Sequence, residues 1–134
     1  MMNKNSLKLV IFAVVLLLGS CGSNPTSTVK FGPSGTTSPG GFTFDMTLSQ
    51  TIISSGGIIN IKVHVITPGG GGAANVPVFF GGDIVAPSVP FVTDSQGNVY
   101  ATLTTNTLIT AGRTGLLTAT VEDQTVNGEY QVKP

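Results

Sequence analysis

The chain of 134 residues is short of cysteine, tryptophan and charge, and each shortage excludes a class of protein or site. Its single cysteine cannot form an internal disulfide, so the folded domain depends on its hydrophobic core alone. Tryptophan is absent, and the six lysines and arginines are scattered along the sequence. Because nucleic-acid binding needs a clustered basic face, no nucleic-acid partner is expected.

Glycine, threonine, valine and isoleucine are plentiful instead, which favours strands and turns over helices. The length allows one ordinary domain. Two of the lysines, Lys4 and Lys8, lie in an N-terminal leader. Without that leader four cations remain against six acidic residues, which gives a net charge of minus two.

The first 20 residues have the three parts of a secretory signal peptide. The two lysines form a positive n-region, an apolar run of ten residues follows at 9–18, and the small residues Gly19 and Ser20 precede Cys21. Ten helical residues span about 15 Å, which is half of a hydrocarbon core of roughly 30 Å. A permanent transmembrane helix is therefore disfavoured, and cleavage after residue 20 is expected.

The segment Leu18-Gly19-Ser20-Cys21 resembles the lipobox, the processing site of bacterial lipoproteins. The resemblance implies signal cleavage between Ser20 and Cys21 and lipidation of the Cys21 thiol, so that the chain is held in a membrane. Two or three acyl chains, at roughly 0.8 kcal/mol per buried methylene, anchor a protein firmly. Gly22 stands where enteric inner-membrane lipoproteins have Asp, which favours the outer membrane in a Gram-negative cell. An ordinary signal peptide with a chance cysteine at the cut is the alternative.

Residues 21–41 are expected to be a lipidated cysteine followed by a flexible linker. Sixteen of the twenty residues in 22–41 are Gly, Pro, Ser or Thr. Such a stretch buries too little apolar surface to offset its ordering entropy, so it is predicted to be disordered, with a reach of about 25 Å on average and about 65 Å at full extension. Val29-Lys30-Phe31 interrupts it, and whether these residues pair as a short edge strand is left open.

Residues 42–134 are expected to form a single immunoglobulin-like β-sandwich of about seven strands, because short alternating apolar and polar runs are separated by turn residues. In the clearest run, Ile59, Ile61, Val63 and Val65 alternate with polar residues. Gly97 is predicted to take a positive φ in a tight turn at 94–98, and a second turn is predicted at 126–129. The expected strands are 42–48, 59–65, 76–80, 91–93, 99–104, 117–122 and 130–132.

The second half of this domain resembles the group-1 bacterial immunoglobulin-like domain of invasins and intimins. The residues that carry the resemblance are the Thr93-Asp94-Ser95-Gln96-Gly97 turn, the strand Ala101-Thr102-Leu103-Thr104, Ala111-Gly112, and Leu117-Thr118-Ala119-Thr120-Val121. The resemblance covers most of residues 50–133 and implies a sandwich and a role in adhesion. The sequence departs from the family where a glycine run and Asn75-Val76-Pro77-Val78 replace the turn before the third strand.

Few residues suggest a chemical site. His64, the only histidine, is most simply a solvated strand residue, and no Gly-x-Ser-x-Gly elbow accompanies it. Asp94 with Ser95, Gln96 and Asn98, or Asp83, or Glu122 with Asp123, offers oxygen ligands to calcium, but the alternating acids of an EF-hand loop are missing. An aromatic binding patch is a further alternative, whose members would be Phe79, Phe80, Phe91 and Tyr100. No catalytic residue, metal site or cofactor is therefore predicted.

The sequence thus favours a non-enzymatic, membrane-anchored envelope lipoprotein whose domain is an interaction or structural module with a protein partner. One copy of the domain makes a poor stalk, so adhesion is a secondary hypothesis. The alternatives are an accessory subunit of a larger envelope machine or surface filament and, less favoured, a small hydrolase that uses His64, Asp94 or Glu122. A strand edge that accepts another chain's strand is one way to bind a partner. The oligomeric state is left open. The residues chosen to mark the candidate binding loops 69–75, 81–90 and 106–113 are Gly70, Asn75, Asp83, Asn106 and Arg113.

Overall fold

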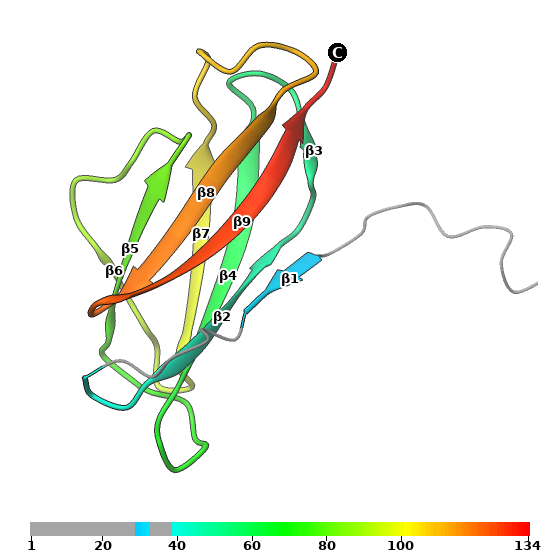
Figure 1. Cartoon of the computed structure of the whole chain (residues 1–134). Helices are drawn as coiled ribbons and strands as arrows, with labels where there is room; N and C mark the ends of the chain where they lie inside the picture. Colours follow the sequence, from blue (N-terminus) through cyan, green and yellow to red (C-terminus); the bar gives the residue numbers. More distant parts are fainter. Residues whose placement is uncertain (1–28, 33–38) are drawn as a thin grey trace, which may run out of the picture.

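The structure, a computed structural model, describes residues 29–32 and 39–134, so the predicted leader, Cys21 and most of the predicted linker lie outside the described residues. The described part holds nine strands and no helix, arranged as two packed sheets (Figure 1). The strands are β1 (Val29–Phe31), β2 (Thr43–Leu48), β3 (Ile52–Ile53), β4 (Ile58–Ile66), β5 (Pro77–Gly82), β6 (Phe91–Val92), β7 (Asn98–Thr104), β8 (Thr114–Val121) and β9 (Gln124–Val132).

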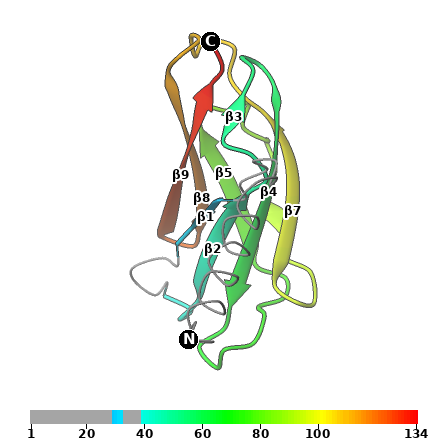
Figure 2. The ribbon, with the colours of Figure 1, turned by 90° about the vertical axis from the view of Figure 1, so that its right-hand side faces the viewer.

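The two sheets have the orders β1-β2-β4-β7 and β3-β9-β8-β5-β6. Figure 2 shows them face to face, with β8 and β9 opposite β4 and β7. In the lettering of the immunoglobulin fold, β2, β4 and β7 take the places of strands A, B and E, and β5, β8 and β9 those of C, F and G. All neighbours are antiparallel except β3, which runs parallel to β9. The predicted all-β sandwich is confirmed, with nine strands in the described residues.

The long strands alternate between buried and exposed residues, as the alternation of apolar and polar residues in the sequence predicts. In β4 the side chains of Ile59, Ile61, Val63 and Val65 are buried, and the residues between them face outward. Strands β7 and β9 alternate in the same way because each has one face on the core between the sheets. The core is thus made of the inner faces of both sheets, and the functional candidates lie on the outer faces, edges and loops.

Two strands exceed the seven that the sequence indicates. Strand β1 comes from the predicted linker and answers the question left open there, since Val29 pairs with Leu48 and Phe31 with Met46 of β2. Strand β3 forms after the chain crosses from one sheet to the other, and its Ile53 is buried. Both are short strands whose partners are distant or lie across a long loop, so local alternation alone does not reveal them.

The predicted turn at 126–129 is wrong, because these residues lie inside β9. The chain instead reverses at Glu122 and Asp123, where Glu122 has a φ of 54°. Asn127-Gly128 resembles a hairpin turn, but Gly128 has a packing role. A Cβ atom there would lie 2.7 Å from Met46 Cε and 3.1 Å from Phe31 Cδ2. A side chain at position 128 would therefore crowd these two side chains.

Candidate interaction surface

The five residues chosen to mark binding loops lie at opposite ends of the sandwich. At the end that carries the C-terminus, the Asn106 N–H donates to Asp83 O at 3.0 Å and the Gly112 N–H donates to Val132 O at 2.8 Å, beside Arg113 (Figure 1). Gly70 and Asn75 belong to the loop at the other end, where the Asn75 N–H donates to Thr93 O at 3.1 Å. The structure therefore does not bring the five residues together in one site.

The loop between β7 and β8 carries Leu108, the most exposed large hydrophobic residue in the described part of the chain. Asn106 Oδ1 accepts a hydrogen bond from the Leu108 N–H at 2.9 Å, which forms a tight local turn. The Leu108 side chain is 81% exposed as a result. Beside it lies a shallow groove of about 290 Å³ lined by residues that include Ile109 and Arg113. Arg113 thus lines this groove, and Asn106 holds Leu108, which lines it as well.

Asp83 has a structural role that the sequence does not reveal. Its carboxylate accepts the Leu116 N–H at 2.8 Å, and its carbonyl oxygen accepts the Tyr130 hydroxyl at 2.5 Å. Tyr130 lies in β9, so this bond connects the loop after β5 to a strand that lies on the far side of β8 in the same sheet. Burial, and secondarily the charge of Asp83, raises the pKa of Tyr130 above its ordinary value. The polar groups of Asp83 are engaged within the fold.

The raised pKa of Tyr130 predicts a loss of stability in alkali. The folded state holds the hydroxyl protonated more strongly than the unfolded chain does, so the unfolded chain releases this proton first as the pH rises. The Tyr130 contribution is complete below the unfolded pKa of about 10 and falls as the pH rises above it. Urea titrations between pH 8 and 11 measure this fall. It is expected to be smaller in Tyr130→Phe and to persist in the control Tyr100→Phe, and an unchanged fall in Tyr130→Phe contradicts the assignment.

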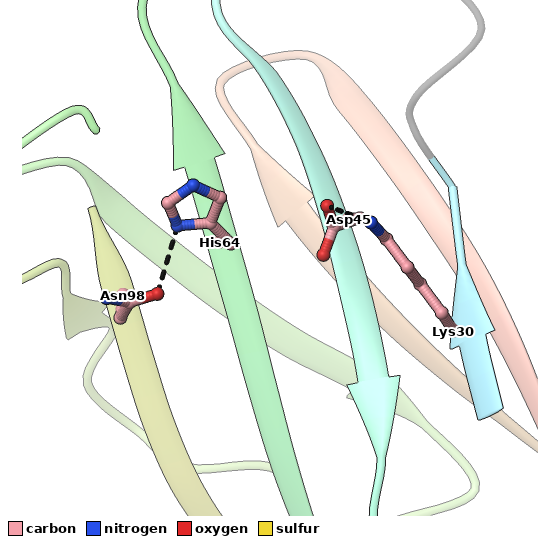
Figure 3. A network of polar contacts seen from close by, with 4 residues as sticks. All are labelled: Lys30, Asp45, His64 and Asn98. Atoms are coloured by element: carbon pink, nitrogen blue, oxygen red, sulfur yellow. Dashed lines mark hydrogen bonds and ion pairs between the residues drawn. The ribbon is translucent and has the colours of Figure 1, made fainter. Parts of the chain in front are cut away.

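A row of polar side chains crosses the outer face of the four-stranded sheet. Asp45, His64 and Asn98 are register partners on β2, β4 and β7. His64 Nδ1 lies 2.9 Å from Asn98 Oδ1, and Lys30 Nζ on β1 lies 3.1 Å from Asp45 Oδ2 (Figure 3). His64 is half-buried in this row and points out of the sheet, as a strand residue facing away from the core does.

The residues considered as calcium ligands are engaged in hydrogen bonds within the domain. The N–H groups of Asn98 and Gln96 both donate to Asp94 Oδ1 at 2.9 Å, and they hold the pKa of that carboxyl below its ordinary value. Glu122 Oε2 accepts the Gly40 N–H at 2.8 Å. Among residues 29–32 and 39–134, no three His, Cys, Asp or Glu residues lie close enough to hold a metal ion.

The four aromatic residues considered for a binding patch are divided between the core and two outer faces. Phe80 is buried and meets the half-buried Phe91 edge to face, with 5.5 Å between the ring centroids. Phe79 on β5 is 52% exposed, and Tyr100 on β7 is 67% exposed. These two side chains lie on the outer faces of different sheets, so a single aromatic patch is not formed.

The outer edge of β7 carries backbone groups without a partner in the described part of the chain. The Thr105 N–H donates to Gly57 O and the Val65 N–H to Gly97 O, so odd-numbered residues along this ladder bond to β4. Even-numbered residues of β7 point away from β4. Both outward groups of Asn98 have a partner, because its N–H donates to Asp94 Oδ1 and its carbonyl accepts the Asp94 N–H. The carbonyl of Thr104 accepts the Val85 N–H. Tyr100 and Thr102 lie between these two residues, and their outward N–H and C=O groups have no partner among the described residues.

Tyr100 and Lys62 border this free edge on the outer face of the sheet. Lys62 Nζ lies 5.7 Å from the Tyr100 ring centroid, within the range of a cation–π contact. A groove of about 260 Å³ opens beside them, lined by residues that include Thr47, Ser49 and Asn60. The sequence marks Tyr100 as an aromatic residue, but only the strand order shows that it stands at an edge.

Comparisons with models of known protein families, with curated protein sequences and with solved structures find no match to this chain. In the part of the chain that the structure covers, no helix has the length and apolar character needed to cross a membrane.

Proposed function

We propose that this chain is a lipid-anchored envelope protein, placed at the outer membrane in a Gram-negative cell, whose sandwich is a non-catalytic interaction module. The module binds a protein partner by adding an extended segment of that partner to the free edge of β7. The observation that carries this proposal is the pair of residues Tyr100 and Thr102, whose outward backbone groups have no partner within the described residues.

Strand addition fits this edge physically. Two N–H and two C=O groups stand in line, and each hydrogen bond to an incoming segment contributes about 0.5–1.5 kcal/mol. The bonds already made by Asn98 and Thr104 close the edge at both ends, so a short segment of the partner pairs here. On the adjoining face, Lys62 offers a cation to an acidic side chain and Tyr100 offers an aromatic ring. These groups give the site its expected preference for an acidic, extended segment.

A proline at the free edge is expected to block the partner. Thr102→Pro removes an N–H that points away from β4, so the sheet within the domain keeps its backbone hydrogen bonds and loses only the side-chain bond from Thr102 to Asn60. Recovery of a partner that co-purifies after mild detergent extraction is expected to fall at least about tenfold, which corresponds to about 1.4 kcal/mol of binding free energy.

The matched control is Thr125→Pro, because Thr125 also directs its N–H away from its neighbouring strand, at the outer side of β9. This variant is expected to retain the partner. Equal retention by Thr102→Pro and Thr125→Pro, or a chain that is monomeric without any partner after the same extraction, contradicts binding at β7.

Substitution of the lipidated residue tests the anchor. Cys21→Ser removes the thiol that accepts the lipid, so labelling with a radioactive fatty acid is expected to disappear and the processed form is expected to be lost. Fractionation and acyl labelling of the wild-type and Cys21→Ser chains are the measurements, with Thr28→Ser as a neutral control. A mutant that still matures and remains membrane-bound with its acyl label would show that the chain is not a lipoprotein.

A further inference from the structure

Strand β1 is bound to a site that the rest of the domain builds. Its backbone pairs with β2, in the register Val29 to Leu48 and Phe31 to Met46. The Phe31 ring reaches across to β9, where Gly128 leaves room for it beside the Met46 side chain. Figure 2 shows β1 beside β2 and close to β9. We call this site, formed by the edge of β2 and by Gly128, the β1 socket.

Every residue that forms the β1 socket belongs to the part of the chain that follows β1. All of its walls come from residues 43–132, and it lies at an edge of the four-stranded sheet, open to the outside. Next to Phe31 the surface continues into a groove of about 340 Å³ lined by residues that include Ile52 and Glu129. A Val29–Phe31 strand from any copy of the chain would therefore meet the same contacts.

The connection between β1 and β2 suits an exchange. After β1 the chain leaves β2 at Gly32, whose φ is 102°, and it is fixed again where the Gly40 N–H bonds to Glu122. The seven residues 33–39 span no more than about 25 Å when extended. Their sequence, PSGTTSP, consists only of Pro, Ser, Gly and Thr. The segment can thus close back on its own domain or cross to a neighbour whose socket is adjacent.

We propose that β1 is exchanged between two copies of this chain, each inserting its β1 into the partner copy's β1 socket to form a closed, symmetric dimer. The strand makes the same contacts in the monomer and in the dimer, so concentration decides between them. A short connection gives β1 an effective concentration at its own socket of the order of millimolar, so exchange competes when the concentration of the chain reaches a similar level. This proposal goes beyond the partner site at β7 and does not depend on lipidation.

Single-cysteine variants test the exchange directly. Lys30 and Thr47 are opposite each other in the register of β1 and β2, and both face outward. The ladder places them at a non-hydrogen-bonded position, where facing Cα atoms are about 4.5 Å apart, close enough for a disulfide. Full-length chains with Cys21→Ser and either Lys30→Cys or Thr47→Cys are mixed in mild detergent and oxidised. A disulfide between the two different chains requires β1 of one copy beside β2 of the other.

In an equal mixture, random pairing gives twice as much heterodimer as either homodimer, so the heterodimer is expected to exceed this twofold ratio clearly. Its fraction is expected to rise at least about tenfold between about 10 µM and about 1 mM protein. Two further substitutions are expected to remove this excess. Phe31→Asp, in the Lys30→Cys chain, disrupts the inserted strand. Gly128→Ala, in the Thr47→Cys chain, narrows the socket. The chain with both cysteines, oxidised at 10 µM, is expected to remain monomeric through an internal disulfide. Internal closure at low concentration, with no excess of heterodimer at 1 mM, would overturn the exchange.

Discussion

Replacing Tyr130 by alanine is expected to lower the free energy of unfolding by about 3–5 kcal/mol, the range for truncating a large buried aromatic side chain. Tyr130 is 1% exposed, and its ring packs directly over Gly115 of β8, where a Cβ atom would overlap it. Its hydroxyl also donates to Asp83 O. The ring thus fills the part of the core that lies against β8, and the hydroxyl holds the loop that follows β5.

Tyr130→Phe separates these two contributions. It keeps the ring and removes the hydrogen bond, but Asp83 O retains the Asn106 N–H as a donor at 3.0 Å. A loss of about 1 kcal/mol is therefore expected. Urea unfolding followed by circular dichroism gives both values, with an unchanged slope showing that the two-state analysis holds. Equal losses in Tyr130→Ala and Tyr130→Phe would contradict a packing role for the ring.

The second large effect is expected at Gly97, where alanine meets both an unfavourable backbone angle and a steric overlap. The φ of Gly97 is 81°, and a Cβ atom there would overlap Val65 O and lie 2.7 Å from Ala73 N. A left-handed non-glycine residue costs roughly 1–2 kcal/mol, and forced overpacking roughly 1–3 kcal/mol more. Gly97→Ala is thus expected to destabilise the domain by about 2–5 kcal/mol.

Gly112 supplies a matched control for this substitution. Its φ is 78°, nearly that of Gly97, but a Cβ atom there would meet nothing within 4 Å. Gly112→Ala is expected to cost only the backbone part, roughly 1–2 kcal/mol. Thermal and urea unfolding of the two variants measure the difference. If both variants lose the same stability, the close approach of the 94–98 turn to β4 has no energetic consequence.

The sequence predicts those parts of the fold that each strand specifies by itself. A strand with one buried face alternates, so β4 and β7 were predicted from their apolar residues, and the positive φ of Gly97 followed from its turn. Strand β1 and the position of Gly128 could not be predicted with the same certainty. Both depend on contacts between β1, β2 and β9, which lie far apart in the chain or across a long loop.

The candidate site was predicted less well for a related reason. Loop composition singled out Gly70, Asn75, Asp83, Asn106 and Arg113, but composition does not say at which end of a sandwich a loop lies. Asp83 proved to be bonded to Leu116 and Tyr130. The free groups at Tyr100 and Thr102 depend on which strand has no neighbour, and that is a property of the strand order.

Strand β1 also determines how the domain faces a bilayer if Cys21 carries the lipid. With β1 docked on its own domain, only seven residues, 22–28, separate Cys21 from Val29, and they span no more than about 25 Å in any conformation. That is far less than the 65 Å of a fully extended 20-residue linker. Because β1 and β7 are the two opposite edges of one sheet, the anchor draws the β1 side toward the lipid. The edge at Tyr100 and Thr102 is then turned outward, to where other proteins of the envelope can reach it.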